Sequence, residues 1–229
     1  MKKGIDTFID SSVSLNGAVK IGDRCSIGAH VIIGQPSIEE VENARERHSG
    51  KLKQLYPKTA IGDDVIVQPN VLISSNVVIG KRVKIGPFVT IGTNTSIGER
   101  TQVMYNSQIH ENVRIGRDCI IGGFLCDFSD VGNCVIIMGS LLHAFRDGWD
   151  EEQNLKNQSP IIEDNVIVCY GSMVIGNVRI KSGTYVAAGA IVTKNTPGNC
   201  VVKSVNECTE IEAYRGRLKD GRFFRGAVI

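Results

Sequence analysis

Four histidines are the side chains of this 229-residue chain best suited to proton transfer at neutral pH. A neutral imidazole, whose ordinary pKa is about 6.5, can take a proton from a hydroxyl or an amine. We expect His30 and His48 to lie on the surface, and His110 to lie at a corner where neighbouring segments have Gly. His143 takes a position that is otherwise aliphatic, just before a polar segment. We therefore predict that His143 is the functional histidine. The alternative is that the coil opens where the chain leaves the repeat, so that the ring simply faces solvent.

A histidine that acts as a base needs a partner that holds its ring in one tautomer. Asp127 and Asp130 are the nearest acidic candidates, one turn of the sequence pattern earlier. Either could instead be an ordinary turn residue, a common role for Asp. The cysteines offer no alternative nucleophile, because none of them stands in a recognisable Cys-His arrangement.

A six-residue repeat sets the elements that must position these side chains. Ile or Val occupies every sixth position from Ile61 to Ile121, and the position after it is frequently Gly. The same spacing runs from Ile9 to Ile33 and again from Ile162 to Val192. The residue four places after each of these is small or branched, as at Val65, Thr95 and Cys119. A short fixed period of this kind indicates a solenoid.

The repeat predicts an all-β, parallel β-helix. Branched residues favour a short strand, and Gly suits the corner that follows it. Three units close a triangular coil of about 18 residues, and coils stack at the strand spacing of about 4.8 Å. We expect about eight coils, each pairing only with its neighbours.

Two polar segments interrupt the repeat, at residues 35–58 and 144–160, and we interpret both as inserted loops of a β-helix domain covering residues 1–203. Ser37 and Glu40 have the spacing of a capping box, which predicts the start of a short helix. Ile121 and Val131 are ten residues apart, which we interpret as a slip of register. Residues 204–229 are predicted to form a C-terminal helix and tail that cover the last coil.

Composition narrows the possible partners. The net charge of +2 is too small to favour nucleic acid as the main partner. No apolar run is long enough to span a membrane, and the N-terminus lacks the apolar segment of a signal peptide. The seven cysteines show no disulfide pattern and no CxxC motif. We expect a reduced, cytoplasmic protein.

The C-terminal half resembles a known family. The segments SLLHAFRDG and SPIIEDNVIVCYGSMVIGNVRIKSGTYVAAGAIVTKNTPGNCVV are similar to the catalytic coils of hexapeptide-repeat acyltransferases, especially the galactoside, maltose and xenobiotic acetyltransferases. The resemblance implies a left-handed β-helix, a homotrimer with active sites between subunits, and an acyl-CoA donor, usually acetyl-CoA. It implies that His143 is the catalytic base and that the backbone N–H of Tyr170 binds the oxyanion. It also implies that Ala188, Thr193 and Lys194 contact CoA.

These observations favour an acyltransferase that acts on a hydroxyl or amine of a small acceptor, with a sugar or a nucleotide-linked amino sugar as the first candidate. No metal is expected. Two alternatives have the same fold: a non-catalytic β-helix scaffold, and a metal enzyme resembling γ-class carbonic anhydrases. The second would need three histidines around zinc, two of them in an HxxxxH spacing that this chain lacks.

Overall fold

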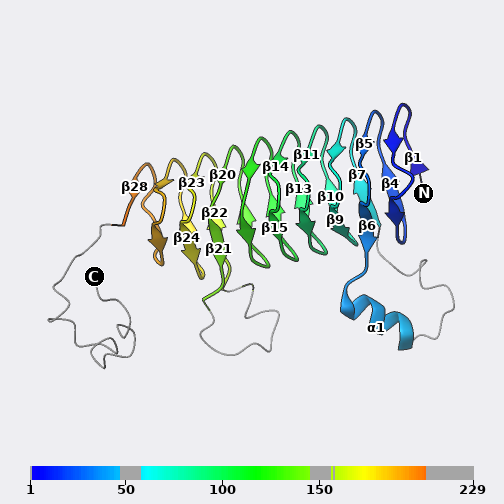
Figure 1. The fold of residues 1–229 in the computed structure, drawn as a ribbon. Helices are drawn as coiled ribbons and strands as arrows, with labels where there is room; N and C mark the ends of the chain where they lie inside the picture. Colours follow the sequence, from blue (N-terminus) through cyan, green and yellow to red (C-terminus); the bar gives the residue numbers. More distant parts are fainter. Residues whose placement is uncertain (1, 47–57, 145–155, 157, 205–229) are drawn as a thin grey trace, which may run out of the picture.

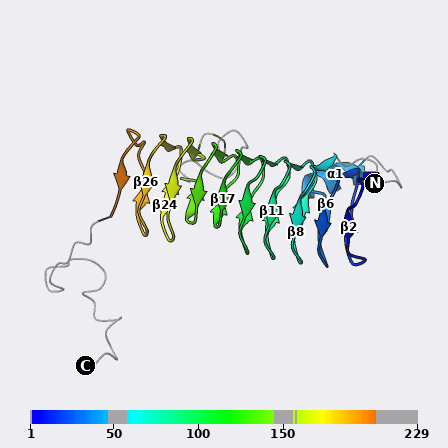
Figure 2. The same ribbon diagram turned by 90° about the horizontal axis from the view of Figure 1, so that it is seen from above.

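The computed structural model describes residues 2–46, 58–144, 156 and 158–204, and it shows a triangular prism of stacked coils. Three parallel sheets run the length of the prism, and each coil contributes one short strand to each sheet (Figures 1 and 2). The predicted parallel β-helix is therefore confirmed. The described residues contain no helix that is long and apolar enough to cross a membrane.

We name the sheets A, B and C in the order in which the chain visits them. Sheet A contains β1 (Lys2–Lys3), β4 (Val19–Ile21), β7 (Thr59–Ile61), β10 (Val78–Ile79), β13 (Ser96–Ile97), β16 (Arg114–Ile115), β19 (Asp130–Val131), β22 (Ile161–Ile162) and β25 (Arg179–Ile180). Sheet B contains β2 (Phe8–Ile9), β5 (Ser26–Ile27), β8 (Ile66–Val67), β11 (Lys84–Ile85), β14 (Gln102–Val103), β17 (Ile120–Ile121), β20 (Ile136–Ile137), β23 (Ile167–Val168), β26 (Tyr185–Val186) and β28 (Val201–Val202). Sheet C contains β3 (Ser14–Leu15), β6 (Ile32–Gln35), β9 (Leu72–Ser74), β12 (Thr90–Ile91), β15 (Gln108–Ile109), β18 (Phe124–Leu125), β21 (Ser140–Leu142), β24 (Met173–Ile175) and β27 (Ile191–Val192). The turns between consecutive strands form three edges of the prism, which we call the AB, BC and CA corners.

The core is the column of aliphatic residues that the repeat predicts. Ile61, Ile79 and Ile97 follow one another on sheet A, and each is almost completely buried. Lys84 pairs with Gln102, eighteen residues later, so three repeat units do close one coil. Burying such side chains contributes roughly 1.5–3 kcal/mol each, which makes this column the main source of stability.

The positions four residues after the repeated Ile or Val, which carry small or branched side chains, are also buried, including those with polar side chains. The Thr101 hydroxyl donates to the Gly116 carbonyl oxygen at 2.9 Å and accepts the Cys119 N–H at 3.1 Å. Thr95 makes the same kind of contact with the His110 carbonyl oxygen at 3.0 Å. Each hydroxyl therefore replaces a Val methyl without leaving an unpaired polar atom in the core.

The six-residue register does slip between Ile121 and Val131, by the loss of two residues from one repeat unit. Leu125 fills the core position only four residues after Ile121, and the coil there has sixteen residues, because Gln108 pairs with Phe124. The BC corner is two residues shorter at this point, and Gly122 and Gly123 form it. A Cβ atom on Gly123 would overlap the carbonyl oxygen of Gly139 in the next coil, which is why the tight corner needs glycine.

The predicted count of about eight coils is too low, because in the described ranges sheets A and C have nine strands each and sheet B has ten. The six-residue count missed β18, which follows a four-residue spacing, and the terminal strands β1 and β28. It counted β21 but placed that strand at His143. The predicted C-terminal helix falls almost entirely outside the described residues. The division at residue 203 stays a prediction.

The first interruption contains the predicted short helix, α1 (Ile38–Glu46). The Ser37 hydroxyl accepts the Glu40 N–H at 3.1 Å, and Glu40 Oε2 accepts the Ser37 N–H at 2.9 Å. This reciprocal pair is the capping box that the sequence predicts. The chain leaves the prism after β6 and again after β21, so both interruptions begin at the CA corner (Figure 1).

Candidate active site

The candidate histidine lies at the CA corner, in a column that continues through successive coils. Ile109, Leu125 and Leu141 are register partners on sheet C. The residues two places after them are Glu111, Asp127 and His143, which therefore occupy equivalent corner positions one coil apart. Parallel strands with a regular coil length place these side chains beside one another, although they are sixteen residues apart in sequence.

The sequence predicts that His143 takes the place of a core aliphatic residue, and this prediction is wrong. Leu141 fills that core position and is completely buried, whereas His143 is half-buried at the corner. The reason is again a shortened BC corner, because Ile137 and Leu141 are only four residues apart. The histidine is thus exposed enough to meet a ligand without any opening of the coil.

The orienting contact of His143 comes from the main chain. Its Nε2 atom lies 3.0 Å from the carbonyl oxygen of Asp127. A carbonyl oxygen only accepts hydrogen bonds, so Nε2 donates in this contact and the neutral ring keeps its basic lone pair on Nδ1. The Ser159 hydroxyl donates to the same carbonyl oxygen at 2.7 Å, which ties the end of the second interruption to this corner.

The two acidic candidates make different contacts. The carboxylate of Asp127 accepts the backbone N–H of Glu111 at 2.8 Å and lies 3.9 Å from Nδ1 of His110. The carboxylate of Asp130 lies on sheet A and accepts a hydrogen bond from Arg114 at 2.6 Å. Asp127 therefore belongs to the corner that holds His143, and Asp130 belongs to a neighbouring face.

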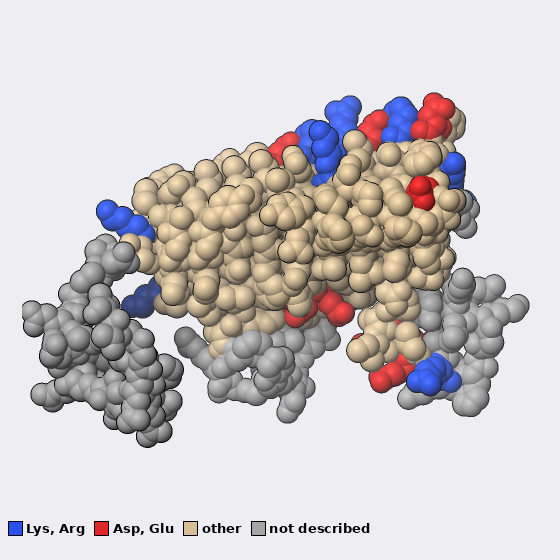
Figure 3. Space-filling model, in the orientation of Figure 1, with Lys and Arg blue, Asp and Glu red and all other residues tan. Residues whose placement is uncertain are grey.

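Acidic and aromatic groups surround this corner. Partial desolvation, followed by the nearby Asp127 charge, raises the pKa of Glu111. The ring of His110 packs against Phe124 with a centroid separation of 4.6 Å. Glu40 of α1 reaches Ser75 at the same corner, with 2.5 Å between Oε2 and the hydroxyl oxygen. Figure 3 shows acidic side chains on this lower edge of the prism.

The remaining predicted site residues fall at two corners. Thr193 and Lys194 follow β27 at the CA corner, two coils beyond His143, and both are exposed. Tyr170 follows β23 at the BC corner, where 68% of its surface is exposed, and Ala188 lies one coil beyond it. Within one chain, Tyr170 and His143 are therefore not brought together.

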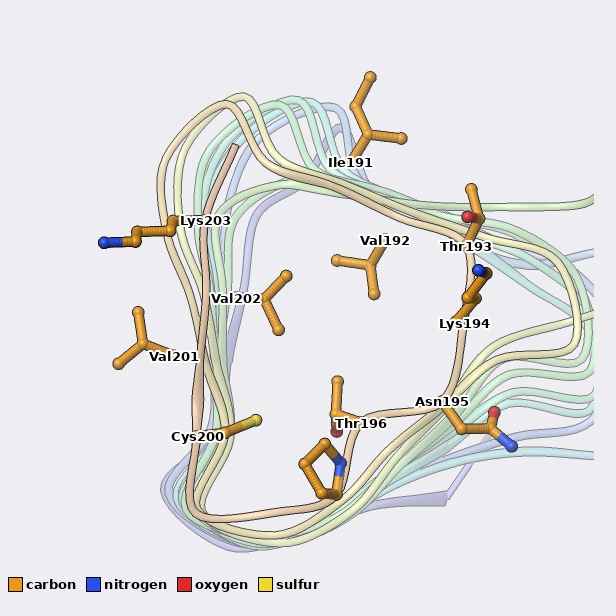
Figure 4. Close-up of a pocket in the computed structure, with 11 residues that line it drawn as sticks. Ile191, Val192, Thr193, Lys194, Asn195, Thr196, Cys200, Val201, Val202 and Lys203 are labelled. Carbon is orange, nitrogen blue, oxygen red and sulfur yellow. The ribbon is translucent and has the colours of Figure 1, made fainter. Parts of the chain in front are cut away.

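A pocket of about 520 Å³ opens next to Thr193 and Lys194. Figure 4 shows that Val192, Val202 and Thr196 point into the interior of the prism there, while Lys194 and Asn195 lie on its rim. The pocket is thus the end of the last described coil, and the predicted CoA contacts Thr193 and Lys194 border it.

Sequence reasoning missed one main-chain group at the same corner as His143. Asn177 follows β24 one coil beyond the histidine. Its N–H donates to no acceptor among the described residues, whereas the neighbouring N–H of Gly176 donates to the Leu142 carbonyl oxygen at 2.8 Å. This position could have been identified from sequence only if the two sixteen-residue coils had been recognised, because they determine which residues lie at each corner.

Residues 58–93 and 94–124 match the family model of the bacterial transferase hexapeptide (six repeats). This match covers less than a third of the chain. The three-sheet prism has the fold of a left-handed parallel β-helix, as the sequence resemblance predicts. The structure of a UDP-N-acetylglucosamine acyltransferase from Campylobacter jejuni is similar in fold, with a TM-score of 0.62 and 15% identity over 84% of this chain and 70% of that chain.

Two curated relatives are similar over part of the sequence. A serine acetyltransferase of Buchnera aphidicola subsp. Schizaphis graminum is 38% identical over 29% of this chain and 26% of the relative. A 2,3,4,5-tetrahydropyridine-2,6-dicarboxylate N-acetyltransferase of Staphylococcus aureus is 37% identical over 23% of this chain and 24% of the relative. The chain spans about a quarter of the length of these relatives.

Proposed function

We propose that this protein is an acyltransferase that moves an acyl group from acyl-CoA to a hydroxyl or amine of a small acceptor, with His143 as the general base. The observation that carries the proposal is the hydrogen bond between His143 Nε2 and the Asp127 carbonyl oxygen. It fixes the ring in one tautomer at a half-exposed corner. The curated relatives, which are named as acetyltransferases, support this reaction class.

The proposed reaction is direct transfer without a covalent enzyme intermediate. Nδ1 of His143 takes the proton of the acceptor O–H or N–H as the acceptor atom attacks the thioester carbonyl carbon. The tetrahedral intermediate then breaks its C–S bond and releases CoA as a thiolate. The imidazolium returns the proton to that sulfur, so the ring is neutral again after each turnover.

The developing oxyanion needs a preorganised N–H donor, which typically contributes roughly a hundredfold or more in rate. The resemblance assigns this role to the N–H of Tyr170, at a BC corner that lies away from the His143 corner of the same chain. The N–H of Asn177 is a second candidate, because it lies at the His143 corner of the same chain and donates to no described acceptor.

We further propose acetyl-CoA as the donor, bound along the C-terminal coils by Ala188, Thr193 and Lys194. The exposed ammonium of Lys194 suits the phosphate groups of CoA, and Ala188 and the adjacent Gly189 leave room for a close approach, since a Cβ on Gly189 would meet nothing within 4 Å. The proposed mechanism requires no metal. A CoA-dependent enzyme fits a cytoplasmic location.

For the acceptor we propose a sugar, with a nucleotide-linked amino sugar as the first candidate. The structural neighbour from Campylobacter jejuni is named for an acceptor of this class, although the fold likeness itself does not identify a substrate. The corner between the two interruptions offers the groups to position such a molecule: the carboxylates of Asp127 and Glu111 and the ring of His110.

A homotrimer with the BC corners near the threefold axis fits the distribution of apolar surface. Exposed aromatic side chains gather at this corner, at Phe88, Tyr105 and Tyr170. Most other large exposed apolar side chains lie on the flanking sheets B and C: Phe8, Ile66, Met173, Tyr185, Ile191 and Val201. The CA corner would then border the groove between two subunits, where the active site is predicted.

Replacing His143 by Ala tests the proposal. The assay measures free thiol released from acetyl-CoA with a panel of amino sugars, other sugars, amino acids and antibiotics. We expect turnover to fall by about a hundredfold or more, because the general base is lost. The control is Lys20→Ala at an exposed position of sheet A, which should retain activity.

Near-normal turnover in a folded His143→Ala protein would reject the assigned base. Thermal unfolding with CoA tests the donor separately, since a bound ligand raises the midpoint by mass action. A wild-type protein whose midpoint does not change with CoA would instead favour the scaffold alternative.

A further inference from the structure

A cationic pocket lies on the AB corner, away from the candidate active site. It has a volume of about 630 Å³ and is lined by Arg24, Asp64, Arg82, Lys84 and Arg100. Four of these side chains are cationic and one is a carboxylate. Figure 3 shows the same gathering of charge along the upper edge of the prism, opposite the edge that carries α1. The protein as a whole is nearly neutral, so this concentration of positive charge is local.

The backbone at this corner does not explain the choice of arginine. Arg24, Arg82 and Arg100 have positive φ angles of 52°, 58° and 60°. Most other non-glycine residues with positive φ in the described chain are Asn or Asp, which tolerate this conformation best. The described chain has no other arginine in this conformation, and all three of these line the one pocket. Unfavourable backbone conformations that persist are a reason to look for function.

Carboxylates hold two of the three arginines in fixed orientations. Arg24 bonds Asp64 through two parallel hydrogen bonds of 2.7 and 2.9 Å. Arg100 bonds Asp118 in the same way at 2.6 and 2.7 Å. These contacts hold the pKa values of both aspartates below their usual range, so both stay ionised. The guanidinium groups at the two ends of the pocket are therefore already oriented.

The two cations between them lie outside these ion pairs. Neither Arg82 nor Lys84 forms an ion pair with any residue in the described part of the chain. Arg82 and Arg100 occupy the same corner position in adjacent coils, which stack at about 4.8 Å. Like charges placed in this way repel each other, and a bound anion would relieve that repulsion.

We propose that this AB-corner pocket binds the phosphate groups of a phosphate or diphosphate ester, with Arg82 and Lys84 as the main contacts. A guanidinium matches phosphate oxygens with two parallel hydrogen bonds, and a lysine adds a point charge. Two biological sources share this chemistry: the diphosphate of CoA and the diphosphate of a nucleotide-linked acceptor. The choice of these two sources rests on the proposed function, whereas binding of inorganic pyrophosphate tests the site by itself.

Isothermal titration calorimetry with inorganic pyrophosphate, ADP and CoA tests the site on the full chain. The test variant is Arg82→Asn/Lys84→Gln, in which Asn keeps a residue that tolerates positive φ. The matched control is Lys2→Gln/Lys20→Gln. This control also removes two exposed cations from adjacent coils, on sheet A, where Lys2 and Lys20 are register partners without ion pairs among the described residues.

We expect the wild-type protein to bind pyrophosphate and ADP with dissociation constants below about 1 mM. The test variant should bind about tenfold or more weakly, because contacts between charged groups are lost, and the control should bind like the wild type. If CoA loses affinity equally, the donor supplies the phosphates. If only ADP and pyrophosphate lose affinity, the acceptor supplies them.

Three results would overturn the inference: no binding of any of the three ligands to the wild type, unchanged binding to the test variant, or an equal loss in the control. The last would indicate a general effect of net charge. His143→Ala should keep full binding of pyrophosphate, so failure of this site and failure of the proposed base are distinguished.

Discussion

At the scale of single residues, the CA corner shows how a coil repeat can bring titratable groups together. Glu111, Asp127 and His143 are neighbours because they occupy one position in three consecutive coils. Their contacts are unequal: Asp127 offers its carbonyl oxygen to His143 and its carboxylate to the Glu111 N–H. Asp127 thus links the proposed base to the rest of the corner through both its main chain and its side chain.

Glu111 gives a prediction about stability and pH. Its folded-state pKa is raised, so its ionisation disfavours the folded protein. The stability linked to the protonated form is complete below the unfolded-state pKa and is lost as pH rises through the folded-state pKa. Glu111→Gln, which resembles the protonated form, should therefore raise the thermal midpoint at pH 7, by roughly 1 °C because the side chain is partly exposed.

This difference should disappear when the thermal scans are repeated below pH 4, where the wild-type carboxyl is protonated as well. Glu99→Gln, which replaces an exposed acid at the AB corner, is the control and should show no such pH-dependent gain. A Glu111→Gln protein that is less stable than the wild type at pH 7 would contradict the argument.

At the scale of elements, the corners rather than the strands decide where side chains go. Strands of two to four residues repeat with little variation, but a BC corner shortened by two residues moves every later residue to a new position. The shortened corners lie between Ile121 and Leu125 and between Ile137 and Leu141. They place Asp127 and His143 on the CA corner and leave the core column continuous.

Gly123 tests the importance of the shortened corner. Gly123→Ala should destabilise the protein by about 2 kcal/mol or more, since the added Cβ would overlap the Gly139 carbonyl oxygen. The thermal midpoint should fall by roughly 4 °C or more. The control is Gly189→Asn, because a Cβ there meets nothing within 4 Å and Asn tolerates its φ of 71°. Equal midpoints for the two variants would show that the corner has room for a side chain.

At the scale of the whole molecule, the prism has one face rich in charge and two faces rich in exposed apolar side chains. Sheet A and the AB corner present ion pairs such as Lys81–Asp63 and Arg114–Asp130. Sheets B and C meet at an aromatic corner.

In the proposed trimer, the AB corner of one chain and the CA corner of the next would flank the same groove. Arg82 and His143 would then be about three coils apart along the axis, roughly 14 Å at strand spacing.

The trimer gives a prediction about mass in solution. Light scattering after size exclusion should give about three times the chain mass of 24.9 kDa. Tyr105→Glu, at the aromatic BC corner, should shift the protein toward the monomer, because a charge would be buried between subunits. Val78→Glu on sheet A, where 52% of the residue is exposed, should leave the trimer intact. A monomeric wild type, or equal effects of the two variants, would contradict this arrangement.

Much of the fold could be predicted from sequence, because one short-range pattern specifies it. A coil contacts only its neighbours, so the six-residue spacing of Ile and Val fixes the strands, the core and the eighteen-residue period. The capping box of Ser37 and Glu40 is local in the same way. The sequence also singled out His143 as the histidine nearest the second interruption.

What depended on corner geometry could not be predicted. The count of six placed His143 in the core, whereas Leu141 lies there, because nothing in the sequence shows that the corner after Ile137 is two residues shorter than the others. The partner of the histidine is a carbonyl oxygen, which every residue carries and which no sequence motif marks. Sequence alone determined the stack of coils, since that depends on neighbours along the chain. Only the tertiary structure decided which side chains share a corner, since that depends on the summed length of every turn before it.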